Sequence, residues 1–201
     1  MSRGQIFVLS GPPGAGKSTA RQALLKKRPS MLYSVSFTSR PPREGEQDGV
    51  DYHFVSREEF WKRHQQGEFA EYNEIFGNFY GTSRKVLQEA LAQGKELLLD
   101  IDVDGAAILK MKFPEGRFIF LTPPSREELE KRLRGRGTES EEQVQERLDR
   151  VAYELSAARG YDYLIFNDKL DETVDGLLAI VTVEQFRTHL TSDELLRKYG
   201  F

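Results

Sequence analysis

The stretch that most constrains the fold of this chain is the octapeptide GPPGAGKS at residues 11–18. The apolar run IFVL precedes it at residues 6–9, and the helix-like segment ARQALL follows at residues 20–25. This is the complete G-x-x-x-x-G-K-[ST] pattern in the setting that it requires, a strand that ends in a glycine-rich turn and opens a helix. Such a turn favours a parallel α/β sheet with its site at the carboxyl ends of the strands.

The same turn predicts a phosphate site. Glycines let the backbone curl around an anion, so that successive N–H groups and the positive end of the helix dipole point at phosphate oxygens. Lys17 would bridge the β- and γ-phosphates of a nucleoside triphosphate, and the Ser18 hydroxyl would bind Mg²⁺. A glycine turn that binds nothing is the alternative, which the full pattern in its strand-to-helix setting disfavours. The predicted triphosphate-binding residues are Gly11, Pro12, Pro13, Gly14, Ala15, Gly16, Lys17, Ser18 and Thr19.

Composition narrows the class of protein. The 201 residues suit one domain with insertions, and the absence of cysteine excludes disulfides and fits a reducing compartment. The N-terminus lacks the charged and apolar regions of a signal peptide, and no run approaches the roughly twenty apolar residues that span a bilayer. A net charge of −3 argues against a general polyanion binder. We therefore expect a cytoplasmic protein with neither nucleic-acid nor membrane partners.

Alternating strand and helix signals run through most of the chain. Apolar runs at residues 96–100, 118–121 and 163–167 are typical of strands buried on both faces of a parallel sheet. Residues 32–37 alternate weakly, as an edge strand does. Helices are predicted at residues 83–92, after Ser125, after Ser140, at about 171–190 and after Thr191. The expected fold class is α/β, with a three-layer P-loop core built on a parallel sheet.

Residues 34–85 depart from this rhythm. They combine a loop rich in proline and charge at residues 38–46, a short strand at 51–55, a helix capped by Ser56 and a hairpin with its turn at Gly77-Asn78. We predict a small mixed β/α insertion there and a helical lid at residues 126–157. The core would comprise residues 1–33, 86–125 and 158–190, the insertion 34–85, and a C-terminal tail 191–201.

Two carboxylates follow the strand predicted at residues 96–100. Asp100 ends that apolar run, where an enzyme with this loop places the acid that holds Mg²⁺, directly or through water. Asp102 would point the same way if the chain were still extended there. Aspartate is also favoured at the start of a helix, so capping is an alternative role for Asp102, and the two roles are compatible.

Arginines crowd around the Gly-x-Gly break at residues 135–137. The planar guanidinium pairs bidentately with phosphate oxygens, and the glycines suggest a hinge that brings it onto the substrate. We expect Arg132, Arg136 and Arg147 to contact phosphates. Arg134 is expected on a solvated face, balanced by glutamates three and four residues away, and the same pairing is the alternative for Arg132.

The insertion carries a second group of cations and hydroxyls. Arg40 and Arg43 lie three residues apart in an irregular loop, and with the hydroxyls of Tyr52 and Tyr80 they would suit a single phosphate on an acceptor molecule. The alternative is that both tyrosines are core or rim aromatics.

Ser36, Glu71 and Thr82 form a possible base-reading set. A carboxylate accepts two hydrogen bonds side by side, and guanine offers a ring N–H beside an exocyclic amine, whereas adenine reverses the key donor and acceptor. Hydroxyl donors would satisfy the guanine carbonyl. Glu71 would equally be an outward-facing strand residue.

The order of these segments resembles the guanylate kinase family to about residue 185. The segments that carry the resemblance are GPPGAGKS at 11–18, VSFTSRPPREGE at 35–46, YHFV at 52–55, GNFYGT at 77–82, LDID at 99–102, RLRGRG at 132–137 and IFND at 165–168. Ser39 departs from the threonine usual in the family but keeps the hydroxyl, so we expect little effect. The tail from about residue 185 extends past the resemblance.

The resemblance implies Mg²⁺-dependent transfer of the γ-phosphoryl group of ATP to GMP or dGMP, with the insertion binding GMP. It implies that the GMP phosphate is held by Arg40, Arg43, Tyr52 and Tyr80. It implies that guanine is read by Ser36, Glu71, Thr82 and Asp102. The resemblance also implies that the ATP phosphates and the transition state are contacted by Arg132, Arg136 and Arg147. It implies that Asn167 lies near the adenine. Whether the chain is a monomer or a homodimer stays open.

This chemistry needs no general base, because the second pKa of a phosphate monoester is about 6 and the acceptor oxygen is largely ionised at neutral pH. Three alternatives to this activity are a non-catalytic guanylate kinase-like interaction module, a nucleotide-driven switch, and a P-loop kinase for another phosphorylated acceptor. The intact Lys17 and Ser18 argue against the first, and the paired arginines at 40 and 43 against the second. The third stays open, because base reading rests on few residues.

Overall fold

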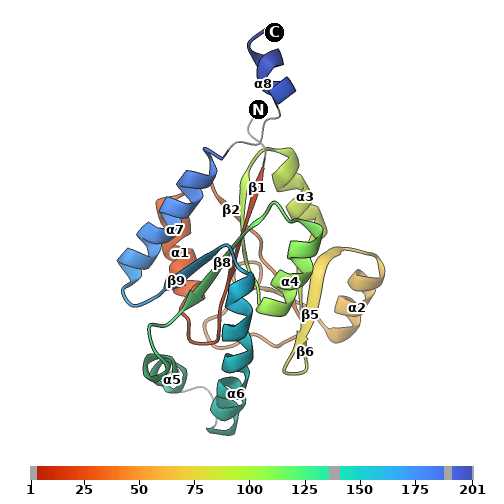
Figure 1. Cartoon of the computed structure of the whole chain (residues 1–201). Helices are drawn as coiled ribbons and strands as arrows, with labels where there is room; N and C mark the ends of the chain where they lie inside the picture. The colour runs from red at the N-terminus through yellow and green to blue at the C-terminus, as the bar shows by residue number, and fades with distance from the viewer. Residues whose placement is uncertain (1–3, 136–140, 188–191, 201) are drawn as a thin grey trace.

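The computed structural model describes residues 4–135, 141–187 and 192–200. Its larger sheet is entirely parallel and has the strand order β2-β7-β1-β8-β9. Figure 1 shows β1, β2, β8 and β9 of this sheet at the centre of the molecule. The strands are β1 (Gln5–Ser10), β2 (Leu32–Tyr33), β7 (Glu96–Asp100), β8 (Arg117–Thr122) and β9 (Tyr163–Phe166). The central strands are apolar on both faces because helices cover both sides of the sheet.

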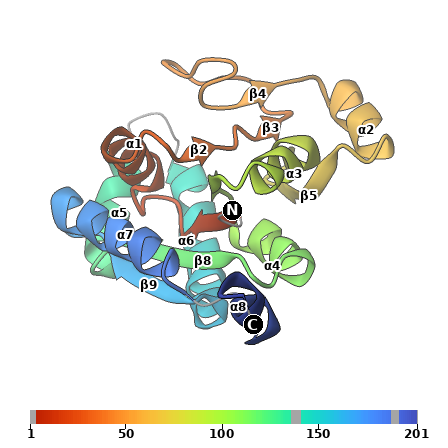
Figure 2. The ribbon, with the colours of Figure 1, turned by 90° about the horizontal axis from the view of Figure 1, so that it is seen from above.

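Two pairs of helices form the outer layers (Figure 2). Helices α1 (Lys17–Lys27) and α7 (Leu170–Glu184) pack on one face, where Phe7 and Leu9 point. Helices α3 (Arg84–Ala92) and α4 (Val103–Lys112) pack on the other face, where Ile6 and Val8 point. The predicted three-layer α/β core is confirmed.

A smaller mixed sheet has the order β4-β3-β6-β5. Its strands are β3 (Phe37–Thr38), β4 (His53–Phe54), β5 (Phe69–Ile75) and β6 (Asn78–Ser83). Helix α2 (Arg57–Gln65) begins after Ser56, whose hydroxyl accepts a 3.1 Å hydrogen bond from the backbone N–H of Glu59. The aromatic side chains of Phe60, Phe69 and Phe79 form a separate core here. The predicted mixed β/α insertion is therefore present.

Strand β5 packs against both cores. Its pairing with β6 shifts between Phe69 and Glu71, which marks a β-bulge. Phe69 enters the aromatic core of the insertion, and Ala70 packs in the core of the larger sheet. Glu71 then faces Thr82 across the ladder. Because of the extra residue in the bulge, three consecutive side chains point to three places. These are the aromatic core of the insertion, the core of the larger sheet and the pocket.

The remaining helices follow β8 and β9. They are α5 (Arg126–Arg134), α6 (Glu141–Ala157), the 3₁₀ turn η1 (Ala158–Gly160) and α8 (Ser192–Lys198). Ser125 caps α5 as predicted, accepting a 3.2 Å hydrogen bond from the N–H of Glu128, while the cap predicted at Ser140 lies outside the described residues. Among the described helices, none has the length and apolar character to cross a membrane. The domain boundaries given above stay a prediction.

Three predicted boundaries are wrong. Residues 32–37 are not one strand, because the chain leaves the larger sheet after Tyr33 and joins the smaller one at Phe37. The hairpin turn is Phe76–Gly77, one residue earlier than predicted, with φ angles of 47° and 72°. Both angles are positive, as a two-residue type I′ turn requires. The long C-terminal helix ends at Glu184 rather than near residue 190.

Candidate active site

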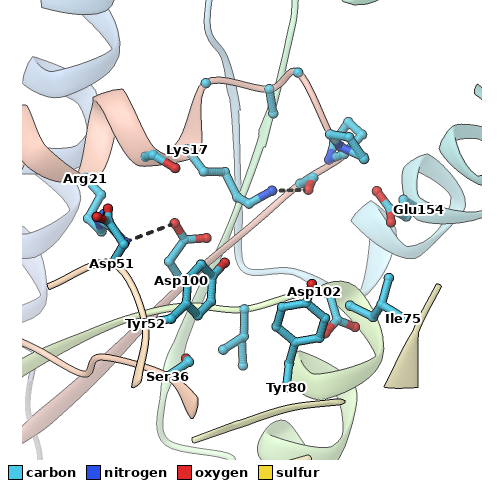
Figure 3. Close-up of a pocket in the computed structure, with 18 of the residues that line it drawn as sticks. Lys17, Arg21, Ser36, Asp51, Tyr52, Ile75, Tyr80, Asp100, Asp102 and Glu154 are labelled. Carbon is cyan, nitrogen blue, oxygen red and sulfur yellow. Dashed lines mark hydrogen bonds and ion pairs between the residues drawn. The ribbon is translucent and has the colours of Figure 1, made fainter. Parts of the chain in front are cut away.

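A pocket lies at the carboxyl ends of β1 and β7, between the phosphate loop and the smaller sheet (Figure 3). It brings together residues predicted from distant parts of the chain. Those that line it are residues 11–18, Ser36, Arg43, Tyr52, Glu71, Tyr80, Asp100 and Asp102. The other described candidates are not among the lining residues: Thr19, Arg40, Thr82, Arg132 and Asn167. The structure thus joins the predicted triphosphate and acceptor sites in one cavity.

The phosphate loop is held open by glycines. Gly11 has a φ of 152° and Gly16 a φ of 83°, and a side chain at Gly11 would come within 1.9 Å of the backbone oxygen of Leu121. Helix α1 begins at Lys17 with no side-chain cap, which leaves its first N–H groups available to an anion. The Lys17 ammonium donates a 2.6 Å hydrogen bond to the carbonyl of Gly11, across the loop that it would help to fill.

The side chain of Asn167 is hydrogen-bonded to the phosphate loop. Its side chain is 6% exposed and donates a 2.7 Å hydrogen bond to the carbonyl of Ala15, while the Thr173 hydroxyl donates to its amide oxygen at 2.9 Å. A side chain at Gly16 would lie 2.4 Å from the Asn167 amide nitrogen. Sequence predicts Asn167 near the adenine. In the structure its side chain is engaged with the loop.

Asp100 ends β7 and faces Lys17, as its place after the apolar run predicts. Burial raises the pKa of Asp100, and the nearby charges of Lys17 and Arg21 oppose that rise. Arg21 lies 3.8 Å from Asp100 and 3.7 Å from Asp51, which belongs to the insertion. The Arg21 side chain is nearly buried, stacks 4.3 Å from the centre of the Tyr33 ring and hydrogen-bonds its hydroxyl. One cation therefore links the core to the insertion beside the predicted metal position.

Asp102 fulfils the capping role that its position allowed. Its carboxylate accepts hydrogen bonds from the N–H groups of Asp104 at 2.9 Å and Gly105 at 3.2 Å, at the start of α4. The amide of Asn73, on β5, donates to the same oxygen at 2.9 Å. Asp102 also lines the pocket, so the cap and a role in binding are compatible.

Glu71 and Thr82 form a buried pair across the ladder of β5 and β6. Their side chains are 5% and 0% exposed, and the Thr82 hydroxyl donates a 2.5 Å hydrogen bond to one carboxylate oxygen. Burial raises the pKa of Glu71 to about 7, and the charge of Asp102 adds to that rise, whereas the Thr82 hydrogen bond and the charge of Lys112 lower it. The other oxygen is left toward Gly105. Sequence left open an outward-facing Glu71, and the burial excludes that alternative.

The predicted acceptor-phosphate residues gather near one another. The guanidinium of Arg40 pairs with Glu46 at 2.8 Å and lies 5.5 Å from the centre of the Tyr52 ring. Glu46 also accepts a 2.8 Å hydrogen bond from the backbone of Arg43. The rings of Tyr52 and Tyr80 meet edge to face, 5.9 Å apart. Burial raises the pKa of Tyr52, so its hydroxyl stays protonated and able to donate.

Of the predicted lid arginines, the structure describes the side chain of Arg132. It donates 2.8 Å and 3.0 Å hydrogen bonds to the Glu128 carboxylate and the Asn167 carbonyl. The glutamate pairing weighed as an alternative is therefore present. Arg136 and the side chain of Arg147 lie outside the described residues.

Helix α6 contributes a pocket residue that the sequence analysis missed. Glu154 lines the pocket, is 5% exposed and accepts a 2.9 Å hydrogen bond from Arg150, and none of the described residues pairs with its second oxygen. Arg150 also pairs with Asp104 at 2.7 Å, which ties α6 to α4. Burial raises the pKa of Glu154, and the charge of Lys17 is the largest effect that opposes the rise.

Comparison with known proteins identifies the family. A family profile described as guanylate kinase matches residues 3–184. The chain belongs to the guanylate kinase family. A guanylate kinase of Carboxydothermus hydrogenoformans is 42% identical over 200 residues, covering 100% of this chain and 98% of the relative. One from Desulfitobacterium hafniense is 46% identical over 186 residues, covering 92% and 93% respectively.

Solved structures agree with this assignment. The crystal structure of guanylate kinase from Anaplasma phagocytophilum has a TM-score of 0.82 and 38% identity, covering 97% of this chain and 94% of that one. Shikimate kinase from Acinetobacter baumannii has a TM-score of 0.51 at 18% identity, covering 91% and 96%, which shows a shared fold alone. The family resemblance seen in the sequence motifs is confirmed.

The pocket residues missed from the sequence of this guanylate kinase include Arg21, Asp51 and Glu154. Arg21 carried a weak signal, since it lies one helical turn after Lys17 on the same face of α1. Asp51 and Glu154 carried none, because their relation to the pocket depends on how the insertion and α6 pack against the core.

Proposed function

We propose how this guanylate kinase transfers the γ-phosphoryl group of ATP to GMP, giving ADP and GDP. The triphosphate of ATP binds residues 11–19, and GMP binds between the phosphate loop and the smaller sheet. The observation that carries the proposal is the one pocket lined both by the Lys17 loop and by Glu71, whose carboxylate accepts a hydrogen bond from the buried Thr82.

Guanine is read by Glu71 together with Ser36, Thr82 and Asp102. An ionised Glu71 accepts hydrogen bonds from the ring N–H and the exocyclic amine, and a hydroxyl satisfies the carbonyl. Because these groups are buried, adenine would leave them unpaired, and such a site discriminates by factors up to about 10⁴ to 10⁵. The deoxyribose analogue dGMP presents the same base edge, so we infer that it is also a substrate.

The acceptor phosphate is held by Arg40, Arg43, Tyr52 and Tyr80. Arg40 is now paired with Glu46, and the phosphate would take over part of that pairing. The acceptor oxygen is already largely ionised at neutral pH, so the task is to align two polyanions and to stabilise the charge spread over the transferring group. Lys17 and the guanidiniums of Arg132, Arg136 and Arg147 supply that positive charge.

The residues present fit Mg²⁺. Asp100 and Ser18 both line the pocket beside the phosphate loop, and Mg²⁺ is typically held by one or two carboxylates together with substrate phosphates and water. Within the described part of the chain there is no group of three or more His, Cys, Asp or Glu side chains that could hold a metal ion. Bound there, the ion would neutralise charge on the β- and γ-phosphates.

Three further expectations belong to this proposal. Asn167 lies near the adenine of ATP, and its side chain is hydrogen-bonded to the loop that binds the triphosphate. A cytoplasmic location fits the reducing compartment favoured by a chain without cysteine. The enzyme works as a monomer or a homodimer, with ATP and GMP or dGMP as its partners.

The deciding experiment is coupled ADP production with GMP, dGMP, AMP, UMP and CMP measured side by side in the presence of Mg²⁺. We expect turnover with GMP and dGMP and little with the other three. Activity on AMP but not on GMP would overturn the role given to Glu71, and equal activity on several monophosphates would favour a P-loop kinase for another acceptor.

A further inference from the structure

A glycine in helix α4 has no conformational reason to be there. Gly105 is the third residue of α4 and has an ordinary helical backbone, in contrast to the glycines of the phosphate loop. Glycine is less favourable than alanine within a helix, because it loses more backbone entropy. The explanation for Gly105 must therefore lie in what surrounds it.

The space beside Gly105 is occupied by the carboxylate of Glu71. A Cβ atom at residue 105 would lie 2.6 Å from one carboxylate oxygen of Glu71 and 3.2 Å from its carboxyl carbon. Real Cβ atoms essentially never lie within 3.0 Å of a neighbouring heavy atom, so something would have to shift. The atom in the way is the end of the Glu71 side chain, so the cost depends on how freely that side chain can move. The same Cβ would lie 3.5 Å from the Asp102 carboxylate, which is an ordinary contact.

Glu71 has little freedom to absorb such a movement. Its side chain is 5% exposed, and its other oxygen is held by the hydroxyl of Thr82 at 2.5 Å. Its backbone is fixed in the ladder of β5 and β6 next to the bulge. A displaced carboxylate would therefore lose the Thr82 hydrogen bond or turn its other oxygen away from its present position beside Gly105.

We propose that Gly105 is a specificity-determining position, which acts by leaving room for the Glu71 carboxylate to face the base. Helix α4 of the core thereby lies directly beside the Glu71 carboxylate, which the insertion contributes to the pocket. Gly105 is a positioning residue, since it acts through Glu71. The inference rests on the proposed role of Glu71 in reading guanine.

The test is Gly105→Ala, with Gly176→Ala as the matched control. Gly176 is also a helical glycine, in α7, and a Cβ there would meet only the side chain of Ile165 at 3.6 Å. We expect G105A to raise the KM for GMP about 10- to 100-fold, as for a misplaced hydrogen bond to a charged group, and to leave the KM for ATP within about twofold. G176A should change neither constant.

IMP, whose base lacks the exocyclic amine, serves as a second acceptor. Because a turned carboxylate no longer meets both donors of guanine, the preference for GMP over IMP should fall in G105A. A purely structural defect would lower activity with both acceptors equally and would raise the KM for ATP as well, and either result would contradict the proposal.

A double-mutant cycle keeps the proposal testable if G105A folds poorly. Glu71→Asp shortens the side chain by one methylene and leaves room for a Cβ atom at residue 105. Gly105→Ala should therefore lower GMP affinity and thermal stability far less in an E71D background than in the parent. Equal costs in both backgrounds would overturn the proposal. If E71D and Glu71→Gln leave the KM for GMP unchanged, the role of Glu71 itself fails. If they raise it and G105A does not, the inference on Gly105 alone fails.

Discussion

Thr82 donates a 2.5 Å hydrogen bond to the Glu71 carboxylate at a depth where neither side chain is more than 5% exposed. The bond favours the charged form of Glu71 against the effect of burial, which favours the neutral form. Thr82 therefore orients the Glu71 carboxylate and limits the rise of its pKa.

Thr82→Val should weaken GMP binding. Valine has nearly the shape of threonine but no donor, so the KM for GMP should rise about 10-fold or more, as for the loss of a hydrogen bond to a charged group. The KM for ATP should stay constant. Thr82→Ser, which keeps the hydroxyl, is the control and should resemble the parent. Steady-state kinetics at pH 7.5 measures all three, and an unchanged KM in T82V would contradict the assignment.

Glu71 should make GMP binding depend on pH near neutrality. Its pKa is raised to about 7, and only the ionised carboxylate accepts both hydrogen bonds from guanine, so the KM for GMP should fall as pH rises from about 6 to 8. The GMP phosphate itself titrates near pH 6. Glu71→Gln should keep that phosphate component and lose the component near 7, which separates the two.

The same pKa predicts the pH dependence of folding. The folded protein holds a proton on Glu71 up to about pH 7, whereas the unfolded chain releases it near 4.5. The stabilisation linked to this proton is present below 4.5 and is lost as pH rises to about 7. Urea denaturation of the parent and of E71Q across this range should show the free energy of unfolding falling less steeply with pH in E71Q. Parallel curves would argue against the raised pKa.

Lys17→Ala should abolish or nearly abolish turnover while the fold is retained. The Lys17 ammonium is the one cation on the loop itself, and removal of a preorganised charged donor costs about 100- to 1000-fold in kcat. Lys27→Ala is the control, because Lys27 lies at the end of the same helix in an exposed ion pair with Asp175. Circular dichroism checks folding, and a near-normal rate in K17A would reject the role of Lys17.

Asn167→Ala distinguishes two roles of Asn167 in ATP binding, holding the phosphate loop and contacting the adenine. If Asn167 acts by fastening the phosphate loop through Ala15, the variant should raise the KM for ATP and for GTP as phosphoryl donors by a similar factor, about 5- to 10-fold for one lost buried hydrogen bond. If Asn167 instead contacts the adenine, only the KM for ATP should rise, and the KM for GTP should stay unchanged. The geometry favours the first outcome, and initial rates with both donors at saturating GMP decide it.

The parts that sequence predicted well are those set by local chemistry. The phosphate loop, the apolar strands and the caps at Ser56 and Ser125 depend on residues a few positions apart, and each is where the pattern placed it. Glu71 and Thr82 were predicted as one set, and the β5–β6 ladder brings them together.

The features that could not be predicted from the sequence depend on packing between segments that are distant along the chain. The split of residues 32–37 depends on which of two sheets offers a partner, and nothing within that segment records the choice. The neighbours of Arg21 come from β7 and the insertion loop, and Glu154 enters the pocket only because of where α6 lies. Gly105 shows the limit best, because its importance is visible only as a distance to a side chain 34 positions earlier.

The bulge in β5 has a consequence for how this enzyme would be redesigned. Since Phe69, Ala70 and Glu71 reach three different surroundings in succession, the insertion cannot be exchanged independently of the core. An insertion grafted from a kinase of another base preference would bring a new residue to position 71 but meet the old helix α4. Grafts that change the base should therefore carry strand and helix together, as one inherited unit.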